Sequence, residues 1–416
     1  MTRRALLAVL SRTRGGNIVL VEGAGRQTLG EPSGISVEVR IHDRRAYGLV
    51  LRQGSIGLAD SYAEGLWDCD DLVGLIRLAA RNMAPLDALR RRCAPVLVPG
   101  QRLGALLRRS TPHRARRDVA AHYDLSNELF ASFLDETLMY SCAVFEDPHM
   151  SLRAAQEAKL DRICRKLSLS PGDHVLEIGS GWGGFAIHAA GRYGCRVTTT
   201  TISEAQRDEA QRRVSAAGLS HLVEVLDRDY RELDGRWHKM VSIEMVEAVG
   251  WRNLPVYLEQ CGRLLDDDGL FCLQAITIDD RAYEVEKGTR SFANTRIFPG
   301  GFLPGLTPIL RATARRTELR PVGLEEIGPH YATTLRHWAR NFAALSPQRL
   351  ATMGFDERFA RLWRFYLAYM EAGFRERRIG TVQLLLAGRA FRGENALLGR
   401  GDDRSQPGLA PQRELL

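Results

Sequence analysis

The sequence predicts an α/β protein in which a Rossmann-like parallel sheet is preceded by a small α+β domain. Between residues 153 and 276, apolar strand-like runs alternate with helical segments, which is typical of a parallel sheet covered by helices on both faces. One strand runs into a glycine-rich turn that opens a helix, where α/β domains bind nucleotide-like ligands. A chain of 416 residues, 44% apolar and 26% charged, fits a soluble enzyme with more than one domain.

Residues 1–117 are predicted to form the small domain and a linker. Residues 35–41 alternate like a strand, residues 70–82 follow a helical pattern, and Pro95, Pro99 and Pro112 mark the linker. The elements predicted next are a helix at 153–167, a strand at 173–178, a helix at 182–193, a strand at 196–202, a helix at 203–217, strands at 222–226 and 239–244, a helix at 252–265 and a strand at 269–276.

Glycine and proline interrupt residues 278–330, which we interpret as a lid or substrate-binding insertion. A helix at 356–376 and a strand at 382–387 are predicted to follow, and residues 391–416 are expected to form a disordered tail.

Residues 173–183 (DHVLEIGSGWG) carry the glycine-rich turn. Gly179, Gly181 and Gly183 have no Cβ to block the approach of a ligand, and the following helix turns its free N–H groups toward it. The spacing differs from the dinucleotide pattern G-x-G-x-x-G and is closer to the first motif of S-adenosylmethionine (SAM) methyltransferases. Taken alone, the motif also fits another nucleotide-binding α/β domain or a tight turn without a ligand.

Composition argues against a secreted protein, a membrane-spanning protein and a structural metal site. The N-terminal apolar run is too short for a signal peptide or a membrane span. Seven cysteines without a CxxC or Cys/His ligand spacing predict a reducing cytoplasm and no structural metal site.

The formal net charge of +8 comes almost wholly from arginine. Many of the arginines lie close together in a run between residues 81 and 117. This run fits a solvated helix face or a surface for anionic phospholipid, where each basic group adds about 1 kcal/mol to membrane binding. Nucleic acid is a weaker interpretation, because no aromatic stacking platform accompanies the arginines. The arginines of this run are Arg81, Arg90, Arg91, Arg92, Arg102, Arg108, Arg109, Arg114, Arg116 and Arg117.

Six clusters resemble, in order and spacing, the cyclopropane fatty acid synthase family. They are 121–127 (AHYDLSN), 134–143 (LDETLMYSCA), 175–183 (VLEIGSGWG), 241–247 (VSIEMVE), 297–304 (IFPGGFLP) and 329–335 (PHYATTL). The resemblance covers residues 118–390, and residues 57–67 (GLADSYAEGLW) resemble the N-terminal domain of the long, phospholipid-acting members. It implies a class I SAM methyltransferase domain behind a lipid-associated domain, in an enzyme peripheral on the cytoplasmic face of a membrane.

The family's reaction makes clear demands on the site. Methyl transfer from SAM to the cis double bond of a phospholipid acyl chain leaves a carbocation. Loss of a proton from the new methyl group closes a cyclopropane ring, whereas a hydride shift gives a methylene precursor of methyl-branched chains in relatives that pair with a reductase. The resemblance implies the cyclopropane as the product here, with the methylene as the alternative. The site therefore needs a dry tunnel, walls that tolerate a cation and a base near the methyl group.

The resemblance implies that the base is a bicarbonate ion bound by Cys142, Glu247 and Tyr331. Glu247 would orient the bicarbonate by accepting a hydrogen bond from it, Tyr331 would donate its hydroxyl, and Cys142 would supply a backbone N–H. Glu244, three residues earlier, is easily confused with Glu247. Structural alternatives are a carboxylate at a helix N-terminus for Glu247, a small buried apolar side chain for Cys142 and a core aromatic for Tyr331.

Two positions depart from the family pattern. Gln274 stands where the family has a histidine ligand of the bicarbonate, and an amide can donate a hydrogen bond but does not titrate, so the identity of the product stays open. Met370 stands where a C-terminal cysteine is often found, which excludes a thiol nucleophile there.

For SAM, the resemblance points to residues at four strand ends. The second strand ends without an acid to hold the ribose, so Gln206 is the expected substitute, and Asp229 is expected to face the adenine amine. A plain N-cap at Ser203 and an ordinary loop carboxylate at Asp229 are the alternatives. The predicted SAM residues are Tyr140, Ser141, Glu177, Gly179, Gly181, Trp182, Gly183, Thr201, Ile202, Gln206, Asp229, Tyr230 and Ile243.

Two other functions compete with lipid C-methylation: a soluble N- or O-methyltransferase, and a non-catalytic membrane-binding protein that retains SAM. The first has no use for the clusters at 118–143 and 297–335, and only Gln274 hints at the second. A homodimer and a partner reductase are possible further partners.

Overall fold

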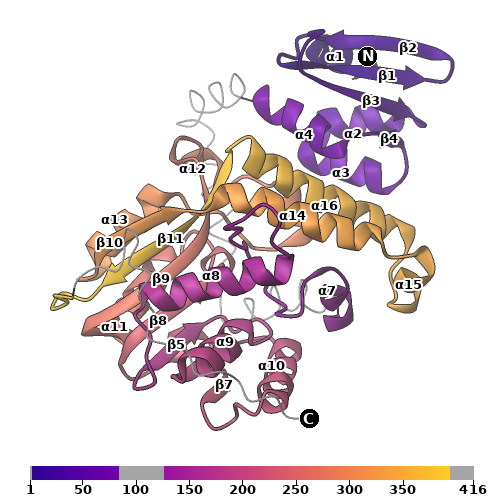
Figure 1. Cartoon of the computed structure of the whole chain (residues 1–416). Coiled ribbons are helices and arrows are strands. Elements are labelled where there is room, and N and C mark those ends of the chain that lie inside the picture. The colour runs from indigo at the N-terminus through magenta and orange to yellow at the C-terminus, as the bar shows by residue number, and fades with distance from the viewer. Residues whose placement is uncertain (1, 84–125, 394–416) are drawn as a thin grey trace.

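The computed structural model describes residues 2–83 and 126–393 (Figure 1). The predicted linker, the arginines from Arg90 to Arg117 and the predicted tail beyond residue 393 lie outside the described residues. The described part has two regions, a small N-terminal domain and a larger α/β domain.

The N-terminal domain is α+β, as predicted. Its sheet has the order β2-β1-β3-β4, in which only β1 and β3 are parallel. Helices α2, α3 and α4 lie between this sheet and the α/β domain (Figure 1). The elements are α1 (Thr2–Leu10), β1 (Gly16–Glu22), β2 (Gly25–Gly30), β3 (Ile35–Ile41), α2 (Arg45–Gln53), α3 (Ser55–Ala63), β4 (Trp67–Cys69) and α4 (Leu72–Arg81).

The large domain is built on a seven-stranded sheet of order β10-β11-β9-β8-β5-β6-β7. Strands β5 to β9 are parallel, as the alternation predicts, while β11 is antiparallel to both of its neighbours. This is the class I SAM methyltransferase fold. The strands are β5 (His174–Ile178), β6 (Arg196–Thr201), β7 (Val223–Asp227), β8 (Trp237–Ile243), β9 (Leu265–Ile278), β10 (Arg320–Glu326) and β11 (Ile379–Ala387).

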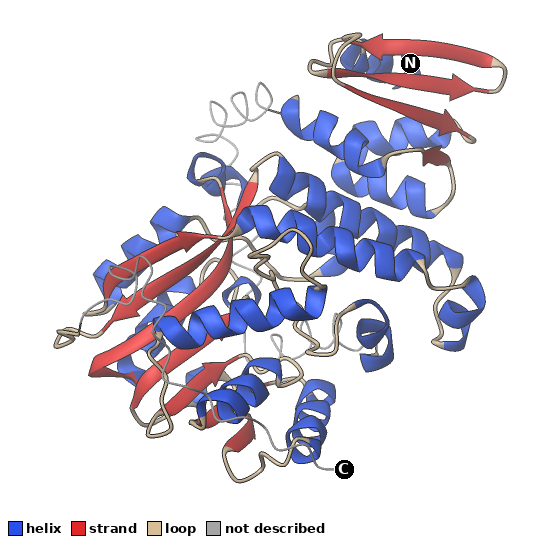
Figure 2. Ribbon diagram, in the orientation of Figure 1, coloured by secondary structure: helices blue, strands red, loops and turns tan. Residues whose placement is uncertain are grey.

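Helices cover both faces of this sheet (Figure 2). Serine or aspartate side chains cap several of them, as Ser151 does at α8 and Asp356 does at α16. The helices are α7 (Asn127–Phe133), α8 (Leu152–Lys166), α9 (Gly184–Tyr193), α10 (Glu204–Ala216), α11 (Leu254–Leu264), α12 (Asp280–Glu286), α13 (Leu306–Arg316), α14 (Gly328–Ala343), α15 (Pro347–Thr352) and α16 (Glu357–Arg375), with short turns η1 (Tyr230–Glu232), η2 (Val246–Ala248) and η3 (Ala293–Ile297).

The insertion predicted at 278–330 is shorter in the structure. Helix α13 belongs to the core, because Ile309 is fully buried in the same apolar cluster as Leu258 of α11. Strand β10 is an edge strand of the main sheet. Its Pro321 and Gly323 hide the strand pattern in the sequence, and an edge strand tolerates both residues. The insertion proper is therefore residues 279–305, which hold α12 and the π-helical turn η3.

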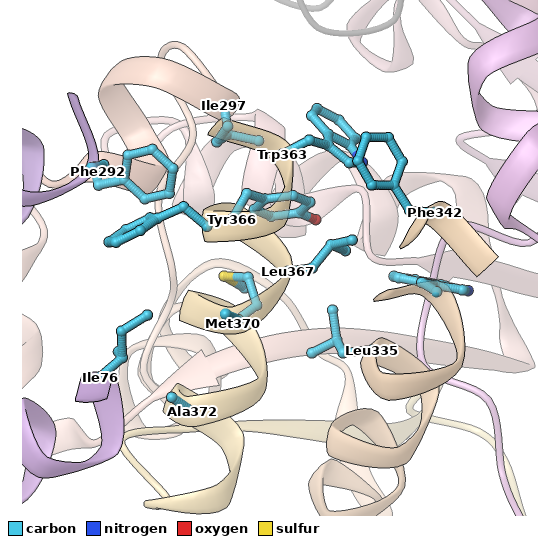
Figure 3. Close-up of a cluster of buried hydrophobic side chains, with 14 of the residues drawn as sticks. Ile76, Phe292, Ile297, Leu335, Phe342, Trp363, Tyr366, Leu367, Met370 and Ala372 are labelled. Carbon is cyan, nitrogen blue, oxygen red and sulfur yellow. The ribbon is translucent and has the colours of Figure 1, made fainter. Parts of the chain in front are cut away.

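The two domains share one apolar cluster and several ion pairs. Ile76 of α4 and Met370 and Ala372 of α16 all belong to this cluster (Figure 3). The Asp60 carboxylate of α3 accepts two hydrogen bonds from Arg296 of η3, at 2.9 and 2.5 Å. Glu376, just after α16, pairs with Arg77 and Arg81 of α4. The N-terminal domain is thus held against both α16 and the insertion.

Candidate active site

The turn after β5 depends on glycine at one position in particular. Gly179 has a φ of +99°, and a Cβ placed there would lie 2.8 Å from Met245 Cγ. Gly181 also has a positive φ of +50°, but open space surrounds it. Gly183 adopts a left-handed conformation as the N-cap of α9. The turn thereby brings the start of α9 to the carboxyl end of the sheet, where parallel α/β domains bind ligands.

A pocket lies at these strand ends, and we call it the glycine-turn pocket. It is lined by Tyr140, Ser141, Glu177, Gly179, Gly181, Trp182, Thr201, Ile202, Gln206, Asp229, Tyr230 and Ile243. Gly183 is the predicted SAM residue that does not line it, because this glycine faces Ala210 of α10 instead. The pattern analysis missed other lining residues, among them Met245 inside the cluster 241–247, and Arg228 and Asn253, which lie outside the six clusters.

Two buried titratable groups lie beneath the glycine-turn pocket. Glu177 accepts a 2.6 Å hydrogen bond from Thr199, and burial raises its pKa to about 8. Lys159 of α8 donates a 3.0 Å hydrogen bond to Ser141, and burial lowers its pKa to about 8. A cationic ligand in this pocket would favour the ionised form of Glu177.

Asp229 and Gln206 both line the pocket with partners of their own. Asp229 accepts two 2.7 Å hydrogen bonds from the Arg231 guanidinium and also caps η1. Gln206 Oε1 accepts a 3.2 Å hydrogen bond from Thr201. Each carboxylate oxygen has a second lone pair. The geometry therefore leaves room for the predicted contacts to the adenine and the ribose, which stay predictions.

Three of the predicted catalytic residues, Cys142, Gln274 and Tyr331, converge on Glu244 and not on Glu247. Glu244 Oε1 accepts hydrogen bonds from Cys142 N at 3.0 Å and from Gln274 Nε2 at 2.8 Å. Glu244 Oε2 accepts a 2.6 Å hydrogen bond from the Tyr331 hydroxyl. Glu244 follows β8 with a φ of +52°, an uncommon conformation for a residue other than glycine.

Glu247 occupies a separate place on η2. One of its carboxyl oxygens accepts a hydrogen bond from the backbone N–H of Ile276, and the other is buried without a hydrogen-bond partner among the described residues. Glu247 lines the large cavity described below, but Gln274 lines neither that cavity nor the glycine-turn pocket. Gln274 therefore contacts the Glu244 carboxylate without lining either cavity.

The two carboxyl groups differ in their surroundings. Burial and the nearby charge of Glu244 together raise the pKa of Glu247 to about 8. Burial also raises the pKa of Glu244, but the hydrogen bonds from Tyr331, Cys142 and Gln274 oppose that rise. Three donors favour an ionised carboxylate, so near neutral pH we assign the charge to Glu244 and the proton to Glu247.

This geometry does not fit a separate bicarbonate ion. The donors expected to bind it already bind the carboxylate of Glu244, and a second anion beside that buried carboxylate would be repelled. The thiol of Cys142 is fully buried, and burial holds its pKa well above the ordinary value. Cys142 therefore contributes its backbone N–H and no thiolate.

A second cavity of about 2040 Å³ lies between the domains, and we call it the large chamber. Its volume exceeds the roughly 300–1,000 Å³ of ordinary ligand pockets. Both domains line it, mostly with apolar side chains such as Leu20 and Ile76 on one side and Leu335 and Met370 on the other. Several of these residues belong to the buried cluster in Figure 3.

The glycine-turn pocket and the large chamber meet at Tyr140, Glu244 and Ala248, which line both cavities. The Tyr140 hydroxyl lies 2.7 Å from the Tyr366 hydroxyl at this junction. A group transferred from one cavity to the other would pass the Glu244 carboxylate.

The chain is similar to proteins of one known family. The model of the mycolic acid cyclopropane synthetase family matches residues 110–384. Tuberculostearic acid methyltransferase UfaA1 of Mycobacterium tuberculosis is 41% identical over 346 residues, covering 80% of this chain and 79% of that protein. Cyclopropane-fatty-acyl-phospholipid synthase of Escherichia coli K12 is 34% identical over 357 residues, covering 84% of this chain and 87% of that protein.

The fold is also similar to solved structures. Mycolic acid cyclopropane synthase CmaA1, crystallised with SAH and CTAB, superposes with a TM-score of 0.61 at 30% identity, covering 67% of this chain and 99% of that chain. Among residues 2–83 and 126–393, no helix is long and apolar enough to cross a membrane. The chain therefore belongs to the mycolic acid cyclopropane synthetase family and is a SAM-dependent fatty-acyl C-methyltransferase.

Proposed function

We propose that the protein methylates the cis double bond of an unsaturated acyl chain in a membrane phospholipid and forms a methylene product. The observation that carries this proposal is the Glu244 carboxylate at the junction of the glycine-turn pocket and the large chamber. A hydrogen-bonded base at the meeting point of a cofactor pocket and an apolar cavity suits a reaction that must remove a proton from a lipid.

SAM would occupy the glycine-turn pocket, beside Glu177, Gln206 and Asp229. When bound, it supplies an electrophilic methyl group. The large chamber would hold the acyl chain, and each buried methylene would contribute roughly 0.8 kcal/mol to its binding. The rings of Tyr140, Tyr331 and Tyr366 line the chamber near Glu244 and could stabilise a cation on the chain.

Glu244 would act as the base. Addition of a methyl group to one carbon of the double bond leaves a carbocation at the other. After a hydride shifts onto that carbon, the methyl group loses a proton to Glu244, and the electron pair of the broken C–H bond forms the methylene double bond. Tyr331 and the backbone N–H of Cys142 would hold the carboxylate toward the junction.

Similarity to tuberculostearic acid methyltransferase supports the methylene product over the cyclopropane. A methylene group needs two electrons and two protons to become a methyl branch, so a separate reductase would complete the sequence. Similarity to the E. coli synthase supports cyclopropane as the second candidate, formed when the new methyl group loses its proton without the hydride shift.

A phospholipid is proposed because of the size of the large chamber and the charges around it. Arg12, Arg14, Arg52 and Arg290 line it beside the apolar residues, and these guanidinium groups suit a phosphate. The enzyme would act peripherally on the cytoplasmic face of the membrane. A homodimer would present two N-terminal domains to one bilayer and so raise the effective concentration of each at its surface.

Mass spectrometry of acyl chains tests the proposal. The purified protein is incubated with SAM and vesicles of oleoyl phospholipid, and the acyl chains are analysed before and after hydrogenation. We expect a gain of one CH₂ that hydrogenation converts to a methyl branch. A gain that survives hydrogenation as a ring would establish the cyclopropane instead. No gain in any lipid fraction would overturn the proposal.

A further inference from the structure

A chain of hydrogen bonds links Glu244 to a buried lysine at the end of α8. Lys166 at the end of α8 donates to Gln383 Oε1 of β11. Gln383 Nε2 donates to Gln274 Oε1 of β9 at 2.9 Å. Gln274 Nε2 donates to Glu244 Oε1 at 2.8 Å. We call these four residues the donor chain.

The direction of the donor chain follows from its two ends. An ammonium group only donates hydrogen bonds, and an ionised carboxylate only accepts them. Gln383 must therefore turn its oxygen to Lys166 and its nitrogen to Gln274, and Gln274 must repeat this orientation toward Glu244. Aligned hydrogen bonds polarise one another, so the charge of Lys166 is transmitted toward the carboxylate.

Burial of the donor chain costs free energy. Gln274 and Gln383 are a directly opposed pair in the antiparallel ladder of β9 and β11, and both are at most 1% exposed. Their neighbours Leu273 and Leu384 show that apolar side chains pack well in this sheet. Burying amides and an ammonium group costs free energy that apolar residues would not. Neither Lys166 nor Gln383 lines the glycine-turn pocket or the large chamber, so contact with a ligand does not account for them.

We propose that Lys166 is a positioning residue of the methyl transfer, which acts through Gln383 and Gln274 to orient Glu244 and stabilise its charge. This inference rests on the proposed function of Glu244 as the base. The inference also gives Gln274 a role that needs no titration. Its amide oxygen accepts a hydrogen bond from Gln383, and its amide nitrogen donates one to Glu244.

Other charged and titratable groups surround both ends of the donor chain. Glu244 faces Tyr331, Cys142, Lys159 and Glu247. Lys166 also donates a 2.6 Å hydrogen bond to Glu325 of β10, which pairs in turn with Arg162. Gln383→Met leaves all of these groups in place, whereas Lys166→Met also removes the ion pair with Glu325, so Gln383→Met reports on the donor chain alone.

The test is the pH profile of kcat at saturating SAM and oleoyl phospholipid. Lys166→Met and Gln383→Met each break the donor chain and leave Glu244 intact. Loss of a stabilising donor raises the pH at which Glu244 ionises, so we expect the acidic limb of the profile to move up by about one pH unit in each variant. Activity should recover at higher pH, which a merely structural defect would not allow. The double variant should shift no further than either single variant, because both remove the same link.

Lys239→Met is the matched control, since Lys239 is a buried lysine of β8 outside the donor chain. It should leave the limb in place. Should Lys166→Met fail to fold, Gln383→Met alone decides, because it removes no charge. The inference would be overturned if the pH profiles of Gln383→Met and the wild type coincided. Additive shifts in the double variant would also overturn it. An inactive wild type, or full activity in Glu244→Gln, would instead overturn the proposed function.

Discussion

The glycine-turn pocket and the large chamber differ in how they are assembled. The pocket is lined mainly by residues at the ends of neighbouring parallel strands, all from one domain. The chamber takes its walls from both domains, from Leu6 of α1 to Ile379 at the start of β11. A change in the pocket should therefore act on one ligand locally, whereas the chamber depends on how the two domains pack. Glu244 lies where the two meet, so it should be the most sensitive position in the molecule.

Glu244→Gln should have the largest effect. It removes the proposed base but keeps the shape of the side chain and its partners. We expect turnover to fall about 10²–10⁴-fold, the usual range for loss of a general base. Affinity for SAM, measured by calorimetry, should stay close to that of the wild type. A variant that keeps its turnover would show that proton removal occurs elsewhere.

Gly179→Ala should have the next largest effect, confined to the glycine-turn pocket. Its Cβ would lie 2.8 Å from Met245 at a positive φ, which a side chain tolerates poorly. Strain of about 1–3 kcal/mol would weaken SAM binding roughly 5- to 150-fold. Gly181→Ala is the matched control, because open space surrounds Gly181, and its loss should be smaller. Equal losses in both variants would argue against the close approach to Met245 as the cause.

Glu247→Gln tests whether Glu247 and Glu244 have different roles. Burial raises the pKa of Glu247 to about 8, so near neutral pH a glutamine resembles the protonated acid, and turnover should fall far less than in Glu244→Gln. A carboxyl whose folded pKa is raised stabilises the fold below its unfolded pKa and loses this contribution as pH rises through the folded pKa. The stability of the wild type relative to the variant should thus decline between about pH 4.5 and about pH 8, as urea unfolding would reveal. A stability difference that does not change with pH would show that folding does not shift the pKa of Glu247.

The same contrast explains what could be predicted from the sequence. The parallel sheet, its helices and the glycine turn follow from local patterns, since strand periodicity and the glycine turn act over a few residues. Most of the other residues predicted to line the glycine-turn pocket, such as Tyr140 and Asp229, rest on the family resemblance. Gly183 does not line the pocket, although its role as a helix N-cap looks the same in the sequence as contact with a ligand. The strand in 320–326 was missed because its proline and glycine resemble a loop.

The predicted catalytic set is centred on Glu247, whereas its other members bind Glu244 in the structure. Glu244 and Glu247 both follow β8, and nothing in their spacing shows which carboxylate receives the donors. That depends on Cys142, Gln274 and Tyr331, which arrive from distant parts of the chain. No sequence pattern points to Gln383, because its importance arises only from its position opposite Gln274 in the sheet.

The smallest expected effect tests the chamber through its domain contact. Asp60→Asn removes the charge that pairs α3 with Arg296 of the insertion. The Arg296 side chain is 42% exposed, and pairs with an exposed member contribute about 0.2–1 kcal/mol, so the KM for lipid should rise about fivefold at most. The KM for SAM should not change, because neither residue lines the glycine-turn pocket. Asp43→Asn breaks a pair with Arg45 inside the N-terminal domain and should change neither constant. A rise in the KM for SAM in Asp60→Asn would mean that the N-terminal domain also acts on the glycine-turn pocket, and the separation between the two cavities would no longer hold.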